Sequence, residues 1–414
     1  MRLTRAVAAL LVLVAVAFPA ATKKKRAPAK KAAPRITAAQ RAAARDEIAA
    51  RLRSDELRIE NAETLAPFYA VADQVLPAPQ IHILQFGDSH TASDDWVQSM
   101  RALLQAKYGD GGPGFVQAGR PYRGYRRYDA RGQNSIGWKT QGTMALGGDA
   151  WQGLSGISIS TSLPGQSVTL SAAGEFLSVF YLRQPGGGSV EVEADGRSLG
   201  RFSTEGETGP GSADFPVTGG PHDVVLRTLD RAPVRLYGWT LDNPQGLTWE
   251  TLGINGAQAN VLLRWDEALW SAEVAARRPA LVVLAYGTNE ANSARWDRET
   301  FRADLAAIVG RLRRAAPQAA ILLIGPPDCG RLKPLPHLAE VVEAEREFAR
   351  EQKVAFWDWR QHMGGAGAMK TWVTAGYAQA DYIHMTGEGY RMVGEMIATS
   401  LLEKRQNEQS GQNR

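Results

Sequence analysis

Ile81-His82-Ile83-Leu84-Gln85-Phe86-Gly87-Asp88-Ser89-His90 is the stretch that decides the fold of this chain. Its first six residues are mostly apolar and have the length of a short buried strand. Gly87-Asp88 then predicts a tight turn that presents Ser89 at the end of that strand. Apolar residues recur at helical spacing from Trp96 to Leu104, so the stretch indicates a strand, a turn and a helix, which is one unit of an α/β sheet.

The same alternation returns in the second half of the chain. Apolar strands are predicted at 281–285, 320–324 and 354–357, and helices at 259–275, 301–315, 338–352 and 390–402. Strands that alternate with helices imply a parallel sheet with helices on both faces. We therefore predict an α/β domain that is formed by residues 36–120 and 246–405, with residues 406–414 as a disordered tail.

The segment 121–245 has a different character. Gly, Ser and Thr are dense there, helical periodicity is absent, and short alternating runs are separated by turn signals at about 8–12 residues. This pattern is typical of an all-β sandwich. The sequence thus predicts a sandwich that is inserted after the first strand–helix unit of the α/β domain.

The N-terminus predicts export. Arg2 and Arg5 precede an apolar run that ends in small residues, so residues 1–21 resemble a signal peptide, and an uncleaved anchor is the alternative. Residues 22–35 are basic and contain no acid, which favours a solvated, disordered linker or a tether to an anionic envelope surface. We expect a periplasmic or cell-envelope protein.

Charge and cysteine content exclude several classes. Residues 1–35 hold nine basic and no acidic groups, so the rest of the chain carries +5 − 9 = −4, and nucleic-acid binding has no support. Cys329 is the only cysteine, so no internal disulfide forms. The residues around Cys329 do not resemble a nucleophile site, and we interpret this cysteine as a small buried hydrophobic residue.

A base and an acid for Ser89 are available in the stretch Asp381-Tyr382-Ile383-His384. Serine is a weak nucleophile that needs a base, and the base needs an acid that orients it. We assign Ser89 as nucleophile, His384 as base and Asp381 as the orienting acid. Taken alone, Gly-Asp-Ser is more often a turn or a helix cap, and Asp-x-x-His is a loop contact or half of a metal site.

A third loop at the predicted sheet edge completes the hypothesis. Strand 281–285 leads into Gly287-Thr288-Asn289-Glu290, and the Asn289 amide, with the backbone N–H groups of Ser89 and Gly256, is assigned to the oxyanion hole. The other histidines lack an acid at orienting spacing or lie away from this edge. No cluster has metal-ligand spacing, so we expect neither a metal ion nor another cofactor.

These segments together resemble a known family. Gly87-Asp88-Ser89, Gly256, Gly287-x-Asn289 and Asp381-x-x-His384 are similar to the four sequence blocks of SGNH (GDSL-type) hydrolases, over residues 81–104 and 247–402. The resemblance implies the flavodoxin-like, three-layer α/β fold of that family. His90 and Glu290 depart from the family pattern at positions outside the triad.

A narrower resemblance points to a substrate. Leu84–Ala92, Gly111–Gly114 and Leu252–Ala257 resemble periplasmic peptidoglycan O-acetylesterases, which carry a sandwich like a carbohydrate-binding module at the same place. The resemblance implies removal of O-acetyl groups from muramoyl C6 hydroxyls of cell-wall glycan. Gly253 rivals Gly256 as the oxyanion glycine, and the spacing after Ile254 favours Gly256.

Several readings of the function stay open at this point. A glycan O-acetyltransferase uses the same triad, an esterase of acetylated xylan or exopolysaccharide has the same chemistry, and a glycan-binding envelope protein has a decayed site. Trp359 and Trp372 precede Asp381, and we expect one of them to stack on a sugar face. Trp357 is assigned to the core.

Overall fold

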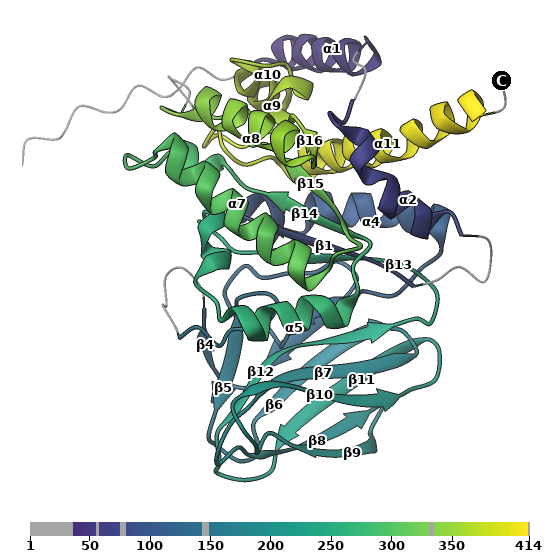
Figure 1. The fold of residues 1–414 in the computed structure, drawn as a ribbon, viewed down its shortest axis with the longest axis vertical. Helices are drawn as coiled ribbons and strands as arrows, with labels where there is room; N and C mark the ends of the chain where they lie inside the picture. The colour runs from purple at the N-terminus through teal and green to yellow at the C-terminus, as the bar shows by residue number, and fades with distance from the viewer. Residues whose placement is uncertain (1–35, 55–57, 75–79, 143–148, 331–334, 413–414) are drawn as a thin grey trace, which may run out of the picture. The chain divides into compact units, whose positions relative to one another are not determined.

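A parallel sheet of five strands forms the centre of the α/β part (Figure 1). This computed structural model describes residues 36–54, 58–74, 80–142, 149–330 and 335–412; the predicted signal peptide and basic linker lie outside them. The strand order is β13-β1-β14-β15-β16, with bounds β1 (Gln80–Gly87), β13 (Gly246–Gly253), β14 (Leu281–Ala285), β15 (Ala320–Ile324) and β16 (Ala355–Trp357). All four pairings are parallel, so the fold is the flavodoxin-like order that the sequence predicted.

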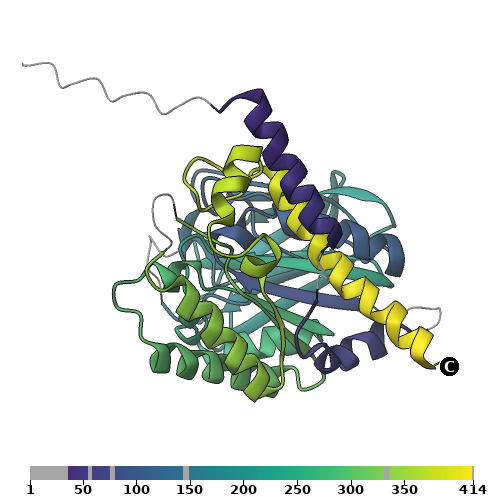
Figure 2. The same ribbon diagram turned by 90° about the horizontal axis from the view of Figure 1, so that it is seen from above.

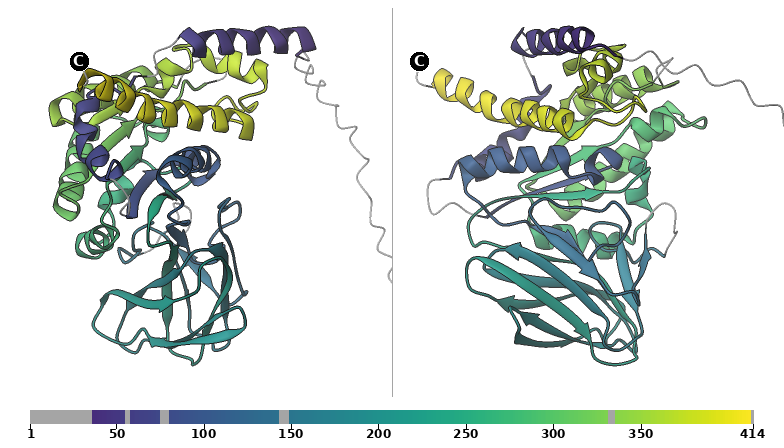
Figure 3. Two further views of the ribbon diagram at one scale, coloured as in Figure 1. Left: turned by 90° about the vertical axis from the view of Figure 1, so that its right-hand side faces the viewer. Right: turned by 180° about the vertical axis from the view of Figure 1, so that it is seen from behind.

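Helices cover both faces of this sheet (Figures 1 and 3). On one face, α4 (Asp95–Tyr108) packs against α11 (Gly387–Gln412). On the other face, α7 (Arg298–Ala315) packs between α5 (Glu267–Arg277) and α8 (Leu338–Gln352). The strands between them are fully buried and apolar, because each strand of a parallel sheet is covered on both sides.

Further helices surround the core. In Figure 2, α1 (Ala38–Ser54) lies across the first part of α11, and it also contacts α10 (Ala368–Ala375). Arg45 of α1 holds both, because it donates to Ala375 O and pairs with Glu388. The remaining helical elements are η1 (Ala62–Leu65), α2 (Ala66–Ala72), α3 (Ser89–Ala92), η2 (Ala259–Leu263), α6 (Thr288–Ala291) and α9 (Trp359–His362).

Two antiparallel sheets lie between α4 and β13 in the chain. One has the order β10-β7-β12-β5-β4, with β2 also paired to β12, and the other has the order β3-β6-β11-β8-β9. The bounds are β2 (Phe115–Gln117), β3 (Arg131–Asn134), β4 (Lys139–Gln141), β5 (Ser158–Thr161), β6 (Ser167–Ala173), β7 (Phe176–Arg183), β8 (Ser189–Ala194), β9 (Arg197–Ser203), β10 (Gly209–Pro216), β11 (Pro221–Thr228) and β12 (Val234–Asp242). Alternate residues of these strands form a separate apolar core, as expected for a sandwich.

The sandwich and the α/β part also share packing. Leu154, Leu182 and Tyr237 belong to the core cluster of the α/β part, together with Trp265 and Trp270 near α5. Since the two parts bury side chains against one another, residues 38–414 form one compact unit. The inserted β part is therefore joined to the sheet by packing as well as by the chain.

Three elements differ from the sequence expectation. The helix expected over 259–275 is divided into η2 and α5, because Asp266 caps α5 by accepting from the Leu269 N–H. β13 was not expected as a strand. α11 continues to Gln412 through most of the segment expected as a disordered tail, since a run of good helix formers, Glu403-Lys404-Arg405-Gln406, extends it.

Among the described residues, none of the helices combines the length and the apolar character that crossing a bilayer requires.

Candidate active site

Ser89, His384 and Asp381 form a continuous chain of hydrogen bonds. Ser89 Oγ lies 2.9 Å from His384 Nε2, and His384 Nδ1 lies 2.8 Å from Asp381 Oδ2. If Nδ1 carries the proton that the carboxylate holds, Nε2 is free to accept the serine proton. The fold thus brings together all three residues that the sequence analysis assigned to a triad, although Ser89 and His384 are 295 positions apart.

The turn after β1 presents Ser89. This serine is the first residue of α3, a single helical turn, and Asp88 caps the turn because its Oδ1 accepts from the His90 N–H at 2.9 Å. A Cβ on Gly87 would lie 2.2 Å from Thr91 Oγ1 and 2.8 Å from Ala285 O. Only glycine lets the turn close this tightly against the sheet. The strand order reverses between β1 and β14, which is where ligands bind in open α/β sheets.

The loop before α11 holds the acid and the base in register. Asp381 Oδ1 accepts from the N–H groups of Ile383 and His384, each at 3.0 Å, while Oδ2 faces the imidazole. Tyr382 has φ +61°, a left-handed conformation that is costly for a tyrosine. Its carbonyl accepts from the Gly330 N–H at 2.9 Å, so neighbouring residues hold the strained loop in place.

Asn289 lies beside both Ser89 and Gly256. Its Nδ2 donates to Ala257 O at 2.9 Å, next to Gly256, and lies 3.5 Å from Asp88 Oδ2, next to Ser89. The second contact is at the limit of a hydrogen bond, so that N–H can turn to a ligand oxygen. The three residues assigned to the oxyanion hole therefore gather at one place.

Glu290 fixes the same loops, a role that sequence reasoning missed. Its Oε1 accepts from the Ala259 N–H and its Oε2 from the Gly287 N–H at 3.0 Å, so that one carboxyl joins the Gly256 loop to the Asn289 loop. Burial raises the pKa of Glu290 to about 7, against the opposing backbone N–H bonds. A glutamate three residues after a turn glycine is a capping-box signal, and that signal was available in the sequence.

The structure separates the two rival glycines. Gly253 is buried, and a Cβ there would lie 2.2 Å from the backbone nitrogen of Ala92. Gly256 is exposed, has φ +76° and has open space where a Cβ would be. Gly253 is thus needed for packing β13 against α3, whereas Gly256 is needed for its conformation and lies on the surface beside Asn289.

Known proteins resemble this chain in sequence and in structure. Residues 217–392 match the model of the GDSL-like lipase/acylhydrolase family, a range that includes Gly256, Asn289, Asp381 and His384. A solved structure described as a peptidoglycan O-acetylesterase superposes with a TM-score of 0.71 at 29% identity, over 83% of this chain and 96% of that chain. The chain carries a GDSL-like acylhydrolase domain. It is a carboxylic ester hydrolase with the SGNH-hydrolase fold.

More distant structures were also found. Family two carbohydrate esterases from Clostridium thermocellum, in complex with cellohexaose, and from Cellvibrio japonicus are 14% and 13% identical, with TM-scores of 0.32 and 0.30. They cover 60% and 66% of this chain, and 94% and 97% of their own chains. This likeness is too low to carry an argument. A comparison with curated proteins returned no match.

The charge states in the acylhydrolase domain suit an acid–base pair. Partial burial acts to raise the pKa of Asp381, but the hydrogen bonds from His384 and from the backbone N–H groups hold it below its usual value. Burial and the nearby His384 lower the pKa of His90 to about 3. His90 is therefore neutral at working pH, and its Nδ1 bonds to the Tyr390 hydroxyl at 2.8 Å, a partner that the sequence did not indicate.

Neither Trp359 nor Trp372 offers a face to a sugar, contrary to our expectation. Trp359 is 2% exposed and stacks on Trp96, and Trp372 is fully buried with its Nε1 bonded to Met363 O. Their apolar rings are packed in the core beneath the site. Trp357 is also buried, as expected.

The remaining histidines have structural partners. His82 bonds to Thr248 and Arg277, His222 to Asp195, His337 stacks on Trp296, and His362 stacks on Trp357. In the part of the chain that the structure covers, no three His, Cys, Asp or Glu side chains are grouped to hold a metal ion. Cys329 is buried, and burial raises its pKa well above the usual value.

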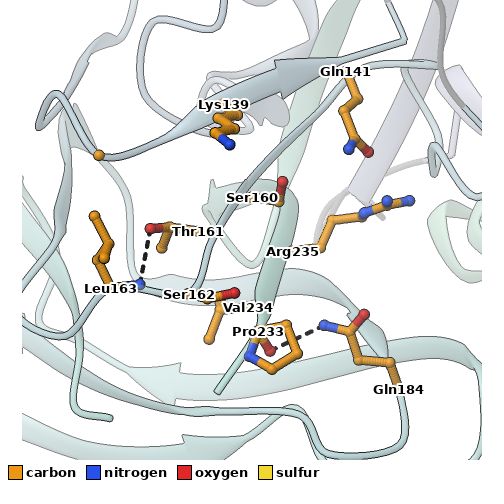
Figure 4. Close-up of a pocket in the computed structure, with 11 residues that line it drawn as sticks. Lys139, Gln141, Ser160, Thr161, Ser162, Leu163, Gln184, Pro233, Val234 and Arg235 are labelled. Atoms are coloured by element: carbon orange, nitrogen blue, oxygen red, sulfur yellow. Dashed lines mark hydrogen bonds between the residues drawn. The ribbon is translucent and has the colours of Figure 1, made fainter. Parts of the chain in front are cut away.

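A pocket of about 500 Å³ lies on the sandwich (Figure 4). Its walls come from β4, β5 and β12 and from the residue after β7, and they carry polar side chains that include Lys139, Gln141, Ser160 and Gln184. None of the triad residues lines it. This pocket is therefore separate from the site on the acylhydrolase sheet.

Proposed function

We propose that this chain is a serine esterase that removes O-acetyl groups from cell-wall glycan, with the muramoyl C6 O-acetyl groups of peptidoglycan as its substrate. The observation that carries the proposal is the hydrogen-bonded chain from Asp381 through His384 to Ser89, at the point where the sheet order reverses. The likeness to a structure described as a peptidoglycan O-acetylesterase supports the choice of substrate.

The first half of the reaction forms an acetyl-enzyme. Ser89 Oγ attacks the acetyl carbonyl carbon while His384 Nε2 takes the serine proton, and the negative charge moves to the carbonyl oxygen. The Asn289 amide and the N–H groups of Ser89 and Gly256 donate to that oxyanion. When the tetrahedral intermediate collapses, the C–O bond to the sugar breaks and His384 returns the proton to the leaving hydroxyl.

The second half releases acetate. Water gives its proton to His384 Nε2 and attacks the acetyl carbon, and collapse breaks the bond to Ser89 Oγ, which takes the proton back. Asp381 stays ionised in both halves because its hydrogen bonds keep its pKa low. It fixes the imidazole tautomer and stabilises the imidazolium.

Exposure favours hydrolysis over acetyl transfer to a second sugar. The side chains of His384 and Asp381 are 34% and 42% exposed, so water reaches the base that must activate it. A transferase needs water to be kept from its acyl-enzyme. This observation favours the esterase over the O-acetyltransferase.

Acetate release from two polymers tests the proposal. We expect release from O-acetylated peptidoglycan at a higher kcat/KM than from acetylated xylan, and we expect Ser89→Ala to lower both by at least about 10³-fold because the nucleophile is gone. The folded state of the variant is checked by its thermal unfolding. Equal kcat/KM on both polymers would disprove the peptidoglycan assignment, and turnover by Ser89→Ala would disprove the triad.

We also propose that residues 121–245 hold the polymer through the pocket in Figure 4, while residues 36–120 and 246–405 carry the chemistry. Polar side chains and one exposed cation, Lys139, suit the hydroxyls of a sugar chain. Lys139→Ala with Gln141→Ala should weaken co-sedimentation with insoluble peptidoglycan several-fold. Arg201→Ala, 67% exposed on the opposite sheet, is the control, and equal binding by all three proteins would contradict this role.

The cell envelope is the proposed location. The similarity to a peptidoglycan O-acetylesterase and the predicted signal peptide support export, and the basic segment 22–35 is proposed to contact the anionic envelope surface. Fractionation of cells that express the full chain tests this, with cytoplasmic recovery as the contrary result.

A further inference from the structure

A basic segment lies between β2 and the first residue of β3. Residues 120–131 hold five arginines and one aspartate, a net charge of +4, in a chain that is acidic beyond residue 35. Arg127 is buried and paired with Asp94 and Asp129. In contrast, Arg120, Arg123 and Arg126 are exposed, so the segment presents its positive charge to solvent.

Arg126 of this segment contacts the end of the helical turn that begins at Ser89. Arg126 Nε donates to Ser93 O at 2.9 Å, and Ser93 directly follows α3, the single turn that Ser89 begins. A four-residue helical turn is about 6 Å long. Ser93, to which the Arg126 guanidinium is bonded, therefore lies about one helical turn from Ser89 along α3.

The same pair also reaches the loop that carries the base. Arg126 Nη2 and the Tyr128 hydroxyl both donate to the carboxylate of Asp95. A Cβ on Gly387 would lie 3.8 Å from Asp95 Oδ1, and Gly387 follows His384 by three residues. Arg126 and Tyr128 are thus held by a carboxylate that lies near the start of α11, three residues after His384.

Their exposed surfaces are unusual for groups that are held this firmly. The Arg126 guanidinium lies 5.3 Å from the centre of the Tyr128 ring, the arginine side chain is 51% exposed, and the tyrosine is 52% exposed. Arg126 Nη1 has no hydrogen-bond partner among the described residues. A fixed ring with an open face and a guanidinium with free donors are what binds a sugar that carries a carboxylate.

We propose that Arg126 and Tyr128, with the exposed Arg123 three residues before Arg126, form a binding site for an anionic glycan strand at the end of the turn that begins at Ser89. The Tyr128 ring packs on a sugar face, and the two guanidinium groups bind carboxylates of the strand. The inference rests on the proposed function and deepens it, because it names the substrate class: a glycan with carboxylates is held and a neutral glycan is not. Trp359 and Trp372 are buried, whereas the Tyr128 ring, which is held by Asp94 and Asp95 at the start of α4, is exposed.

Binding without turnover provides the first test. In the Ser89→Ala background, co-sedimentation with purified insoluble peptidoglycan is measured in 50 mM and 500 mM NaCl. We expect Arg123→Gln with Arg126→Gln to weaken binding about five- to tenfold at low salt and to reduce its salt dependence, because exposed charge pairs are screened. The control is Arg314→Gln, an ion-paired arginine that is 64% exposed on α7. Binding and salt dependence equal to those of the parent would overturn the proposal.

Turnover provides the second test. On O-acetylated peptidoglycan the double variant should raise KM about fivefold with a small change in kcat, since these groups hold the strand and take no part in the chemistry. On acetylated xylan, which is neutral, the rise in KM should be smaller. An equal rise on both polymers would show that the arginines only support the loop.

Two variants of Tyr128 distinguish the role of its ring from the role of its hydroxyl group. Tyr128→Phe keeps the ring and loses the bond to Asp95, whereas Tyr128→Ala loses both. We expect KM on peptidoglycan to rise several-fold for Tyr128→Ala and less for Tyr128→Phe, and the reverse order would contradict a stacking role. A fall in Tm would reveal that Arg126→Gln loosens the segment. In that case Arg123→Glu alone provides the test, because the Arg123 side chain makes no hydrogen bond within the described residues.

Failure of this inference differs from failure of the proposed function. Arginine-dependent sedimentation by a wild-type chain that releases no acetate from peptidoglycan would leave the binding site standing and remove the function. Acetate release that is insensitive to all of the arginine and tyrosine variants would do the opposite.

Discussion

At the residue scale, the site depends on polar groups that each form hydrogen bonds with two neighbouring groups. Asp381 orients His384 through one oxygen and fixes its own loop through the other. Asn289 joins the neighbourhood of Ser89 to that of Gly256. Because each group has two partners, its side chain is held in one rotamer, which is the pre-organisation that a reacting ester requires.

Asn289→Ala should lower kcat about 100-fold with little change in KM, because one oxyanion donor is worth about 3 kcal/mol in the transition state. Hydrolysis of p-nitrophenyl acetate gives both constants. Asn260→Ala is a matched control, since the Asn260 amide bonds to Asp304 instead. A kcat for Asn289→Ala within threefold of wild type would remove this residue from the oxyanion hole.

The three residues of the hydrogen-bonded chain, Asp381, His384 and Ser89, were within reach of sequence reasoning, because Asp-x-x-His and Gly-Asp-Ser are local patterns. The bond from Ala259 to Glu290 and the partner of His90 were not, since a hydrogen bond between positions 31 residues apart leaves no local pattern; the spacing from Gly287 to Glu290 indicated only the local half of the Glu290 contacts. The failed expectation for Trp359 has the same origin. Whether a tryptophan faces a site or the core depends on packing.

At the element scale, the turn between β1 and α3 is set by close backbone approach. α3 is pressed against β13 where Gly253 has no side chain, and against β1 at Gly87. These contacts fix the height of Ser89 above the sheet. Residues without a Cβ are what allow that distance.

Gly253→Ala should lower the free energy of unfolding by more than about 2 kcal/mol, because the added methyl meets the backbone of Ala92, which cannot move alone. Urea unfolding measures the change. Gly310→Ala is the matched control. It lies inside α7 with only the end of the Arg314 side chain near its Cβ position, so it should gain about 0.5–1 kcal/mol. A stable Gly253→Ala protein would contradict the packing role.

Strong periodicity predicted the buried strands β14 and β15 and the helix α8. β13 was missed, because Gly246–Gly253 mixes Thr, Glu and Trp, and its polar residues are buried only through partners from other elements. Arg277 of α5 pairs with Glu250, and Thr251 bonds to Asp94. Tertiary contacts therefore decided that Gly246–Gly253 forms a strand.

At the scale of the whole molecule, the sandwich and the acylhydrolase sheet are joined by a buried contact. Glu273 of α5 accepts from the Leu154 N–H, which lies between the sandwich strands β4 and β5. Burial raises the pKa of Glu273 to about 8, against the opposing hydrogen bond. Leu154 belongs to the shared core, so removing the whole sandwich would expose apolar surface of the sheet domain.

Glu273→Gln should change how stability depends on pH. A raised folded pKa contributes stability that is present below pH about 4.5 and is lost as pH rises to about 8. Since glutamine does not titrate, the variant should gain stability relative to wild type between pH 5 and pH 8.5, by up to about 4 kcal/mol. Urea unfolding at the two pH values measures this gain, with exposed Glu47→Gln as control. A difference that is independent of pH would show that Glu273 does not titrate in this range.

The sequence by itself determined the alternation of strands and helices, the interruption by a β-rich segment, and the choice of Ser89, His384 and Asp381 as candidate site residues, because periodicity and short motifs are local. Only the tertiary structure decided which polar groups meet. It placed Glu290 between two loops, buried Trp359 and Trp372, and brought Arg126 of the segment after β2 to the residue that follows α3. Contacts between distant segments depend on how elements pack around a shared core, and a linear pattern does not encode that packing residue by residue.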